Sequence, residues 1–435
     1  MSDIYGDEFL KFVAEHSGEN ADRLRLRYQR GASESVRAAI AHIEASAKGR
    51  RKFPGIGDGW VFPSLLSVEQ STPPATAAFN VSTALHLFDD PLKLRVLDMT
   101  AGLGMDALGF ARMGHLMTLC EINPAHAEAL RHNFAPYPSV KVVEGDSTTW
   151  LAEYYGEKFD VIFIDPARRD ASGGRVYNLH DCTPDITALL PMLQRNARLI
   201  VAKLSPMLDT TQTLRDLPGC SELHIVEEDG ECRELLAVIP SEGSKSPAEI
   251  VIDKPQDGFT YRFIPSENGP EAVFVAPDIL GGPYGSCSLH PGQYIVEPSS
   301  SLMKAGCFGR ICHDFDLKML APNSHAFVSD KPVAAPIGIV SRITEIFPFA
   351  SGKLRAIGRK IGAAEVIARN LPGITSELLR KKLGVGESSE RRVLGTTVGD
   401  GARVLIVLDK QIQVSERHSS KYDTQSENRN LNADR

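Results

Sequence analysis

The chain has 435 residues, of which 42% are hydrophobic and 24% charged, with seven cysteines and a formal net charge of −7. This length is too great for a single core, and the composition is that of a soluble globular protein with several domains. No apolar run is long enough to cross a bilayer, the acidic N-terminus lacks the pattern of a secretory signal, and the scattered cysteines do not suggest a disulfide framework. We therefore expect a cytoplasmic protein without a membrane association.

The first two regions of the chain differ in their apolar spacing. Apolar residues at helical spacing predict an N-terminal helical region over residues 1–75, which becomes rich in glycine and proline from Arg50 to Pro74. Residues 76–240 alternate β-like runs with helix-compatible stretches, which predicts a Rossmann-like α/β domain with parallel strands. The β-like runs lie at residues 94–98, 116–121, 140–146, 159–165 and 198–203, and two apolar segments around EDGE in residues 221–239 predict an antiparallel hairpin at the sheet edge.

Smaller α+β units are expected after Pro240. Residues 241–330 contain short apolar runs and one helix candidate at residues 300–305, and residues 331–412 contain the strand candidates GIVSRITEIF and ARVLIVLD with the helix candidate SELLRKKL between them. The polar residues 413–435 predict a disordered tail.

Charge is divided unevenly along the chain. Residues 331–412 contain 14 lysines and arginines against seven acidic residues, a net charge of +7, whereas residues 1–330 carry −14. A basic module on an acidic body is typical of an enzyme that docks a nucleic acid through a separate domain. Arg380, Lys381 and Lys382 are the candidate contacts, with a solvated helix face as the alternative.

Four acidic residues follow the ends of four predicted parallel strands: Asp98, Glu121, Asp146 and Asp165. Ligands bind outside the carboxyl ends of such strands, so these side chains are expected to share one rim. A single acid in this position is readily explained as a helix N-cap, but four in register favour a binding site.

The loop DMTAGLGMDAL joins the first strand to its helix and contains Gly102 and Gly104, which would let a ligand approach the backbone. Carboxylates at Asp98 and Asp106 would repel the diphosphate of a nicotinamide or flavin cofactor, which is the alternative. They favour S-adenosylmethionine, whose ammonium, sulfonium, ribose hydroxyls and adenine amine suit carboxylates. The predicted cofactor-binding residues are Asp98, Thr100, Gly102, Gly104, Asp106, Glu121 at the ribose, Ile122, Asn123, Asp146 and Ser147 at the adenine.

The stretch VIFIDPARRD suggests the catalytic group. Asp165 and the carbonyl of Pro166 would accept hydrogens of an exocyclic amine and favour the geometry that attacks a methyl group, although Asp-Pro can also simply begin a turn. Arg168 and Arg169 would bind phosphates or a base edge, or else pair with nearby acids. Arg175 is a weaker candidate.

Two other chemistries are disfavoured. Methylation at a pyrimidine C5 needs a cysteine after the fifth strand, but KLSPMLD has none, and a buried or helix-capping thiol is the simpler interpretation of Cys182. Cys307, Cys312 and His313 lack the fourth ligand of a structural zinc site, so no metal is expected.

The sequence resembles the bacterial class I methyltransferases that carry a C-terminal THUMP-like domain. The motifs that carry this resemblance cover roughly residues 60–410 and include SVEQST, LDMTAGLGMD, CEIN, IDPARR, KLSPMLD, ECRELL, EPSSSLMKAG, APNSHAF and LGTTVGDGARVLIV. The family implies a class I methyltransferase sheet, a ferredoxin-like domain over residues 241–330 and a THUMP-like domain over residues 331–412. The segment TPPATAAFN departs from the family pattern, so the resemblance leaves open whether Gln70 or Ser71 contacts the cofactor.

The expected function is S-adenosylmethionine-dependent methylation of an exocyclic amine in tRNA or rRNA, either guanine N2 or adenine N6. The alternative is a non-catalytic RNA-binding or assembly protein on a methyltransferase scaffold. A small-molecule or protein methyltransferase fits less well with the basic C-terminal module.

Overall fold

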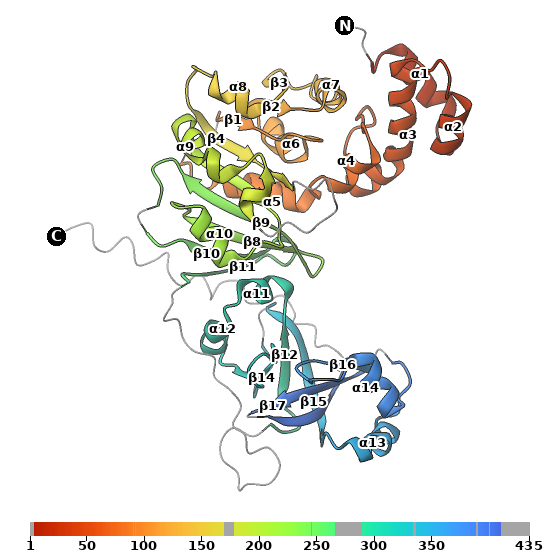
Figure 1. Cartoon of the computed structure of the whole chain (residues 1–435), viewed down its shortest axis with the longest axis vertical. Coiled ribbons are helices and arrows are strands. Elements are labelled where there is room, and N and C mark those ends of the chain that lie inside the picture. Colours follow the sequence, from red (N-terminus) through yellow and green to blue (C-terminus); the bar gives the residue numbers. More distant parts are fainter. Residues whose placement is uncertain are drawn as a thin grey trace, which may run out of the picture. The chain divides into compact units, whose positions relative to one another are not determined.

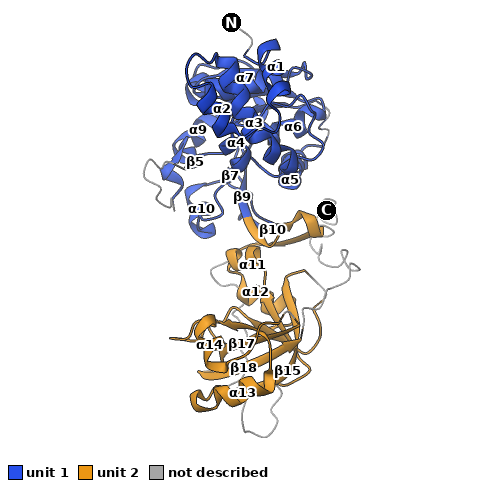
Figure 2. Ribbon diagram, turned by 90° about the vertical axis from the view of Figure 1, so that its right-hand side faces the viewer, with its two compact units in different colours: residues 1–228, 233–251 blue, residues 229–232, 252–435 orange. Residues whose placement is uncertain are grey.

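The computed structural model describes residues 4–89, 91, 93–168, 178–244, 246–265, 289–333, 336–388, 390–399 and 401–409, without the side chain of Arg168. The predicted tail at residues 413–435 therefore lies outside the described residues. The chain divides into two compact units, one of residues 1–228 and 233–251 and the other of residues 229–232 and 252–435 (Figure 2).

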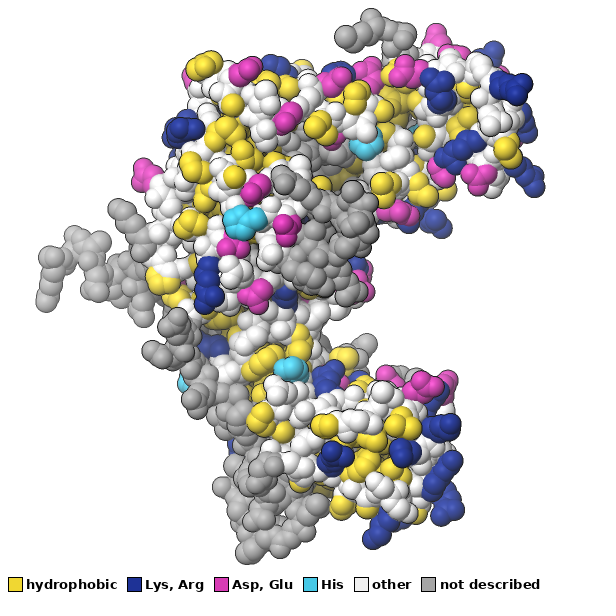
Figure 3. Space-filling view, in the orientation of Figure 1, with side chains coloured by type: hydrophobic (Ala, Val, Ile, Leu, Met, Phe, Trp, Pro, Cys, Tyr) yellow, Lys and Arg dark blue, Asp and Glu magenta, His cyan; other side chains and the backbone are white. Residues whose placement is uncertain are grey.

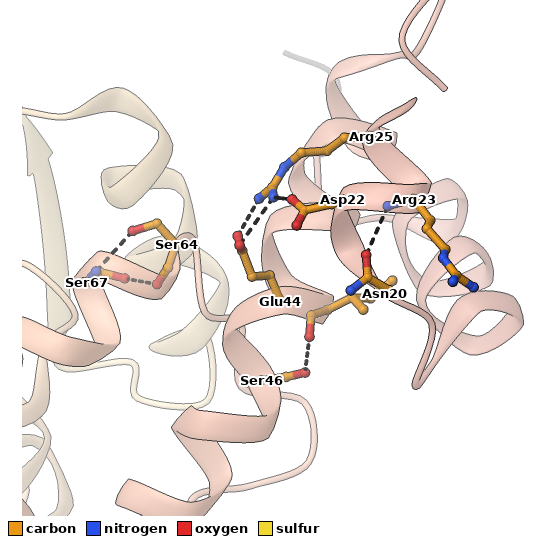
Figure 4. Close-up of polar contacts among 9 residues, drawn as sticks. Asn20, Asp22, Arg23, Arg25, Glu44, Ser46, Ser64 and Ser67 are labelled. Carbon is orange, nitrogen blue, oxygen red and sulfur yellow. Dashed lines mark hydrogen bonds and ion pairs between the residues drawn. The ribbon is translucent and has the colours of Figure 1, made fainter. Parts of the chain in front are cut away.

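The N-terminal region is helical, as predicted. Asn20 and Ser64 accept hydrogen bonds from main-chain N–H groups and cap the helices that begin at Ala21 and Leu65 (Figure 4). The side chain of Arg25 contacts Asp22 in its own helix, at 2.9 Å, and Glu44 in the following helix. A core that includes Phe9, Leu24 and Ile40 holds these helices together. The helices are α1 (Asp7–His16), α2 (Ala21–Arg27), α3 (Glu34–Lys52), α4 (Leu65–Gln70) and α5 (Pro74–Leu85).

A nine-stranded sheet follows in the chain, with the strand order β11-β10-β8-β9-β7-β4-β1-β2-β3 (Figure 1). The five runs predicted from the sequence form parallel neighbours β3, β2, β1, β4 and β7, and β9 pairs antiparallel with β7. The predicted Rossmann-like class I methyltransferase sheet is thus confirmed. Its strands are β1 (Arg95–Asp98), β2 (Leu116–Glu121), β3 (Val140–Glu144), β4 (Phe159–Ile164), β7 (Ala197–Leu204), β8 (Glu222–Glu228), β9 (Glu231–Pro240), β10 (Glu249–Lys254) and β11 (Phe259–Phe263).

The hairpin of β8 and β9 turns at Asp229 and Gly230, which have φ angles of 53° and 76°. Positive φ at both central residues is the signature of the tight turns that join antiparallel strands, and Asp-Gly is a preferred pair there. The prediction of an antiparallel hairpin is confirmed. The runs that form β10 and β11 were expected among the short strands of the next domain, yet they continue the first sheet beyond β8.

The helices that connect these strands are short and well capped. Asn123, Asp146, Asp185 and Asp209 cap four of them through side-chain oxygens. The helices are α6 (Met105–Arg112), α7 (Pro124–Asn133), α8 (Ser147–Ala152), α9 (Ile186–Asn196) and α10 (Thr210–Asp216), with the 3₁₀ turn η1 (Leu179–Asp181) and a two-stranded ladder of β5 (Ala167–Arg168) and β6 (Cys182–Thr183).

The second unit contains a seven-stranded sheet in the order β13-β14-β12-β15-β18-β17-β16. Its core includes Ile295, Leu394 and Ile406. The predicted helix at residues 300–305 and the predicted strands at GIVSRITEIF and ARVLIVLD are confirmed. The elements are β12 (Tyr294–Pro298), α11 (Ser300–Ala305), α12 (Phe308–Asp314), β13 (Lys318–Met319), β14 (Phe327–Ser329), β15 (Gly338–Pro348), α13 (Leu354–Ile361), β16 (Glu365–Ala368), α14 (Ser376–Leu383), β17 (Arg391–Val398), β18 (Ala402–Asp409) and the 3₁₀ turns η2 (Pro255–Asp257) and η3 (Ser351–Lys353).

Among the described residues, no helix combines the length and the apolar character that a membrane span requires.

Candidate functional site

The four acidic residues predicted to share one rim follow adjacent strands of the sheet. β1 ends at Asp98 and β2 at Glu121, while Asp165 directly follows β4 and Asp146 lies two residues after β3. Asp98 pairs in register with Leu119 of β2 and with Phe163 of β4, and Glu121 pairs with Glu144 of β3. The carboxyl ends of these parallel strands therefore lie side by side, and the rim exists as predicted.

The glycine loop after β1 depends on two left-handed residues. Gly102 and Gly104 have φ angles of 53° and 78°, which favour glycine. A Cβ at Gly104 would also lie 2.6 Å from the ring of Phe134 and 2.9 Å from Leu130. Close packing of the loop against α7 therefore requires glycine at this position.

Asp98 is a buried carboxyl, with 4% of its surface exposed. Its Oδ1 accepts a hydrogen bond of 3.0 Å from the N–H of Thr100. Burial, with the neighbouring Asp106 and Asp165, raises the pKa of Asp98 to about 8, although the Thr100 N–H opposes the rise. A positively charged ligand beside Asp98 would favour the ionised carboxylate and oppose this rise in the pKa.

Glu121 is fixed by main-chain donors on both sides. Its Oε2 accepts from the N–H of Gly102 at 2.9 Å, and its Oε1 accepts from the N–H of Asn123 at 2.7 Å. Each carboxylate oxygen has a second acceptor site, so the group retains the capacity to bind a pair of hydroxyls. Beside it, Ile122 is 71% exposed and offers an apolar surface at the rim.

Asp146 caps α8. Its Oδ1 accepts from the N–H and the hydroxyl of Thr148 at 2.8 and 2.7 Å. The Thr148 hydroxyl and main-chain N–H lower the pKa of Asp146. The helix-cap explanation therefore applies to this acid, and a role at the adenine stays a prediction, as it does for the buried Ser147 beside it.

Asp165 is held at both its main chain and its side chain. Its N–H donates to Thr100 Oγ1 at 2.7 Å, and its Oδ2 lies 2.5 Å from Lys203 Nζ in β7. Burial raises the pKa of Asp165, Lys203 lowers it, and Asp106 raises it, with a net shift upward. Although burial lowers the pKa of Lys203, the carboxylates of Asp165, Asp106 and Glu234 raise it above its ordinary value.

Asp106 receives two hydrogen bonds, one from Thr72 just before α5 and one from Asn80 within α5. Thr72 Oγ1 donates to Asp106 Oδ2 at 2.6 Å, and Asn80 Nδ2 donates to Oδ1 at 3.0 Å. The side chain of Gln70 is exposed, and Ser71 Oγ donates to the carbonyl of Val68. Of the three consecutive residues Gln70, Ser71 and Thr72, it is thus Thr72 that contacts a predicted site residue, Asp106.

Four side chains at this site were not among the predicted residues: Thr72, Asn80, Lys203 and Glu234. Lys203 begins the motif KLSPMLD, which contributes to the family resemblance and lacks the thiol that C5 methylation requires. Glu234 in β9 is 3% exposed, and burial raises its pKa to about 8, against the lowering effect of Lys203. The sequence did contain a signal for two of them: a charged residue within a mostly apolar run, Lys203 in RLIVAKL and Glu234 in RELLAVI.

Some predicted residues cannot be placed. Arg169 and Arg175 lie outside the described residues, and so does the side chain of Arg168. Cys182 is buried, with 4% exposed, and its thiol lies 3.9 Å from the carbonyl of Asn178. Within the described ranges, no three His, Cys, Asp or Glu residues are grouped so as to hold a metal ion.

The predicted basic residues Arg380, Lys381 and Lys382 are exposed in the last turns of α14, where Arg380 pairs with Glu387. α13 packs closely against this helix, because a Cβ at Gly358 would overlap the carbonyl of Leu383. Lysine and arginine side chains gather over these two helices (Figure 3). The set of exposed basic residues on α13 and α14, named here the basic helix pair, is Arg355, Arg359, Lys360, Arg380, Lys381 and Lys382.

Comparison with protein-family models finds two matches in the second unit. A ferredoxin-like domain matches residues 294–335, and a THUMP domain-like family matches residues 340–410.

Curated relatives match part of the chain. The small subunit ribosomal RNA methyltransferase J of Alkalilimnicola ehrlichii is 40% identical over 17% of this chain and 31% of its own length. The enzyme of the same name from Shewanella loihica is 31% identical over 30% of this chain and 44% of its own length. The chain thus spans less than half the length of these curated relatives.

A solved structure matches nearly the whole chain. The crystal structure of a "putative methyltransferase" from Porphyromonas gingivalis W83 is 28% identical, covers 93% of this chain and 97% of its own, and superposes with a TM-score of 0.77.

Proposed function

We propose that this chain, which belongs to the class I methyltransferases with a C-terminal THUMP-like domain, transfers a methyl group from S-adenosylmethionine to an exocyclic amine of an RNA base. The observation that carries the proposal is the row of carboxylates formed by Asp98, Glu121 and Asp165 along adjacent strand ends.

The residues at the rim suit this cofactor. Asp98, a buried carboxyl at the end of β1, would hold the ammonium group of the methionine part. Glu121, fixed by two main-chain N–H groups, would accept the ribose hydroxyls, and the exposed Ile122 would lie against the adenine. Nearby carboxylates would disfavour the diphosphate of a dinucleotide, which supports a methyl donor over a nicotinamide.

When bound, S-adenosylmethionine supplies an electrophilic methyl group whose bond to sulfur breaks with both electrons going to sulfur. Asp165 and the Pro166 carbonyl would accept the two hydrogens of the substrate amine and turn its lone pair toward that methyl group. Among the described residues, the side-chain hydrogen bond of Asp165 uses Oδ2, so Oδ1 is the oxygen we assign to the substrate. After the new N–C bond forms, the surplus amine proton passes to Oδ1 or to water.

The basic helix pair would bind the phosphate backbone of the RNA. Its six exposed cations lie in the domain that matches the THUMP-like family, and cations of this kind supply sequence-independent affinity for nucleic acids. The RNA is a tRNA or an rRNA. The names of the curated relatives make small-subunit rRNA the first substrate to test, with guanine N2 or adenine N6 as the acceptor.

The test is mass spectrometry of nucleosides from the tRNA and rRNA of a deletion strain and its parent. The proposal expects one methylated base to disappear in the deletion strain, to return with the wild-type gene and to stay absent with Asp165→Ala. A control gene with Lys158→Met, a change in an exposed residue of the same domain, should restore the base.

A non-catalytic RNA-binding or assembly protein predicts a different outcome. In that case the nucleoside profile of the deletion strain would equal that of its parent, and Asp165→Ala would complement any growth defect. This result would overturn the proposed reaction.

A further inference from the structure

We propose that Lys203 is a positioning residue that keeps Asp165 ionised and correctly oriented, and that Thr72 of the N-terminal region holds Lys203 in place. The inference rests on the catalytic role proposed above for Asp165, but it concerns the state of that carboxyl in the protein itself.

Strand register places the two side chains together. β4 and β7 are parallel neighbours, with Ile164 paired to Ala202, so that Asp165 and Lys203 are the next residues along each strand. Lys203 Nζ lies 2.5 Å from Asp165 Oδ2, and only 13% of the lysine side chain is exposed. Since Thr100 Oγ1 accepts from the N–H of Asp165, the residue is fixed at its main chain and at one carboxylate oxygen.

Lys203 lies among several carboxyl groups in the described part of the site, with Lys52 as a further cation that interacts with it. Asp98 from β1, Asp106 from α6 and Glu234 from β9 each interact electrostatically with Asp165 and with Lys203. Without the ammonium group, these acids would favour the protonated form of Asp165. A protonated carboxyl has a hydroxyl in place of one acceptor oxygen and is a poorer partner for an amine hydrogen.

Thr72 orients the lysine. Its hydroxyl accepts from Lys203 Nζ at 3.0 Å and donates to Asp106 Oδ2 at 2.6 Å, so it links β7 to α6. The segment that carries Thr72 is anchored in turn by Lys52, whose Nζ donates to the carbonyls of Val68, Glu69 and Ser71 at the end of α4. The N-terminal region therefore contributes to the geometry of the catalytic turn.

A direct test follows the Asp165 carboxyl by carbon-13 NMR of protein labelled at aspartate Cγ. The Asp165 resonance is the one that Asp165→Asn removes. Replacing Lys203 with methionine should move the titration midpoint of this resonance to higher pH, because the acids Asp98, Asp106 and Glu234 remain without the opposite charge of Lys203. Lys203→Arg should leave the midpoint close to that of the wild type, and Lys158→Met should leave it unchanged. An identical midpoint in the wild type and Lys203→Met would overturn the proposal.

Activity supplies the second readout, with small ribosomal subunits from the deletion strain and tritiated S-adenosylmethionine as probes. Lys203→Met should reduce kcat at pH 7 by at least about tenfold and recover part of it at higher pH, as expected for a carboxyl that has lost an opposite charge. Lys203→Arg should restore the wild-type pH profile. A uniform loss at every pH, without rescue by arginine, would mean that Lys203 is merely structural.

Thr72→Val keeps the test valid if Lys203→Met does not fold. Loss of this hydroxyl should move the Asp165 midpoint and the acid limb of the pH profile in the same direction, by less than Lys203→Met. No shift in either readout contradicts the role of Thr72. If the wild type transfers no methyl group but the NMR midpoint moves as expected, the proposed reaction fails while the positioning of Asp165 stands.

Discussion

Asp165 donates its main-chain N–H to the hydroxyl of Thr100 at 2.7 Å, across the ends of two adjacent strands. The N–H of Thr100 in turn donates to Asp98 at 3.0 Å. The turn that carries the proposed catalytic group is therefore tied to the loop that would hold the methionine end of the cofactor.

Replacing Thr100 with valine should loosen this connection. The variant keeps the side-chain shape but leaves the Asp165 N–H without its acceptor, which should lower the free energy of unfolding by about 1–3 kcal/mol. Because the catalytic turn would also be less well placed, kcat should fall at least about tenfold. Urea denaturation and single-turnover methyl transfer measure the two effects. Thr100→Ser keeps the hydroxyl and should resemble the wild type in both, and equal behaviour of valine and serine would refute the role of this bond.

Asp98→Asn should stabilise the protein at alkaline pH while abolishing cofactor binding. The folded chain retains the Asp98 proton up to a pH of about 8, whereas an unfolded chain loses it near pH ~4. The folded state thus binds more protons between these values, and the free energy of unfolding falls as the pH rises through this window. Removal of the acid should raise the melting temperature at pH 8 by roughly 2–4 °C, with a much smaller gain at pH 4. A lower melting temperature at pH 8 would contradict this assignment of the buried charge.

Gly104→Ala should be more destabilising than its backbone angle alone explains. Alanine at φ 78° is strained, and its Cβ would overlap Phe134 and Leu130. Gly114→Ala is a matched control, since Gly114 has a φ of 86° but no atom within 4 Å of the added Cβ. The difference between the two variants in urea denaturation should be about 1–3 kcal/mol. Equal losses would show that the loop does not pack tightly against α7.

The sequence predicts much of the nine-stranded sheet and its connections because its signals are local. Alternating apolar runs indicated the five parallel strands, the Asp-Gly pair indicated the hairpin of β8 and β9, and the acids at strand ends indicated the rim. Each of these features depends on a few consecutive residues.

The contacts that complete the site are not local. Thr72 lies 34 residues from Asp106 and 131 from Lys203 along the chain, and no periodicity links such distant positions. The position of Glu234 likewise depends on the pairing of β9 with β7, which brings the β8–β9 hairpin beside the site. The burial of Lys203 and Glu234 in largely apolar strands shows that something must compensate each charge, but only the fold identifies the partner.

The basic helix pair should control RNA affinity. Changing Arg380, Lys381 and Lys382 to alanine should weaken RNA binding and reduce the slope of log affinity against log salt by roughly 2, as for the loss of three contacts to single-stranded phosphates. Filter binding with small-subunit rRNA at several salt concentrations measures both quantities. The same three changes at Arg112, Lys141 and Lys158, exposed basic residues of the first unit, provide the control. An unchanged slope in the α14 variant would make this helix face a solvated surface.

The central claim is that the row of carboxylates at the strand ends binds S-adenosylmethionine. Calorimetric titration of the purified protein with S-adenosylmethionine and S-adenosylhomocysteine tests it most directly. We expect one molecule of either ligand to bind per chain, the affinity to rise with pH toward 8 as Asp98 loses its proton, and NADH not to bind. Absence of both adenosyl ligands together with tight binding of NADH would contradict the account.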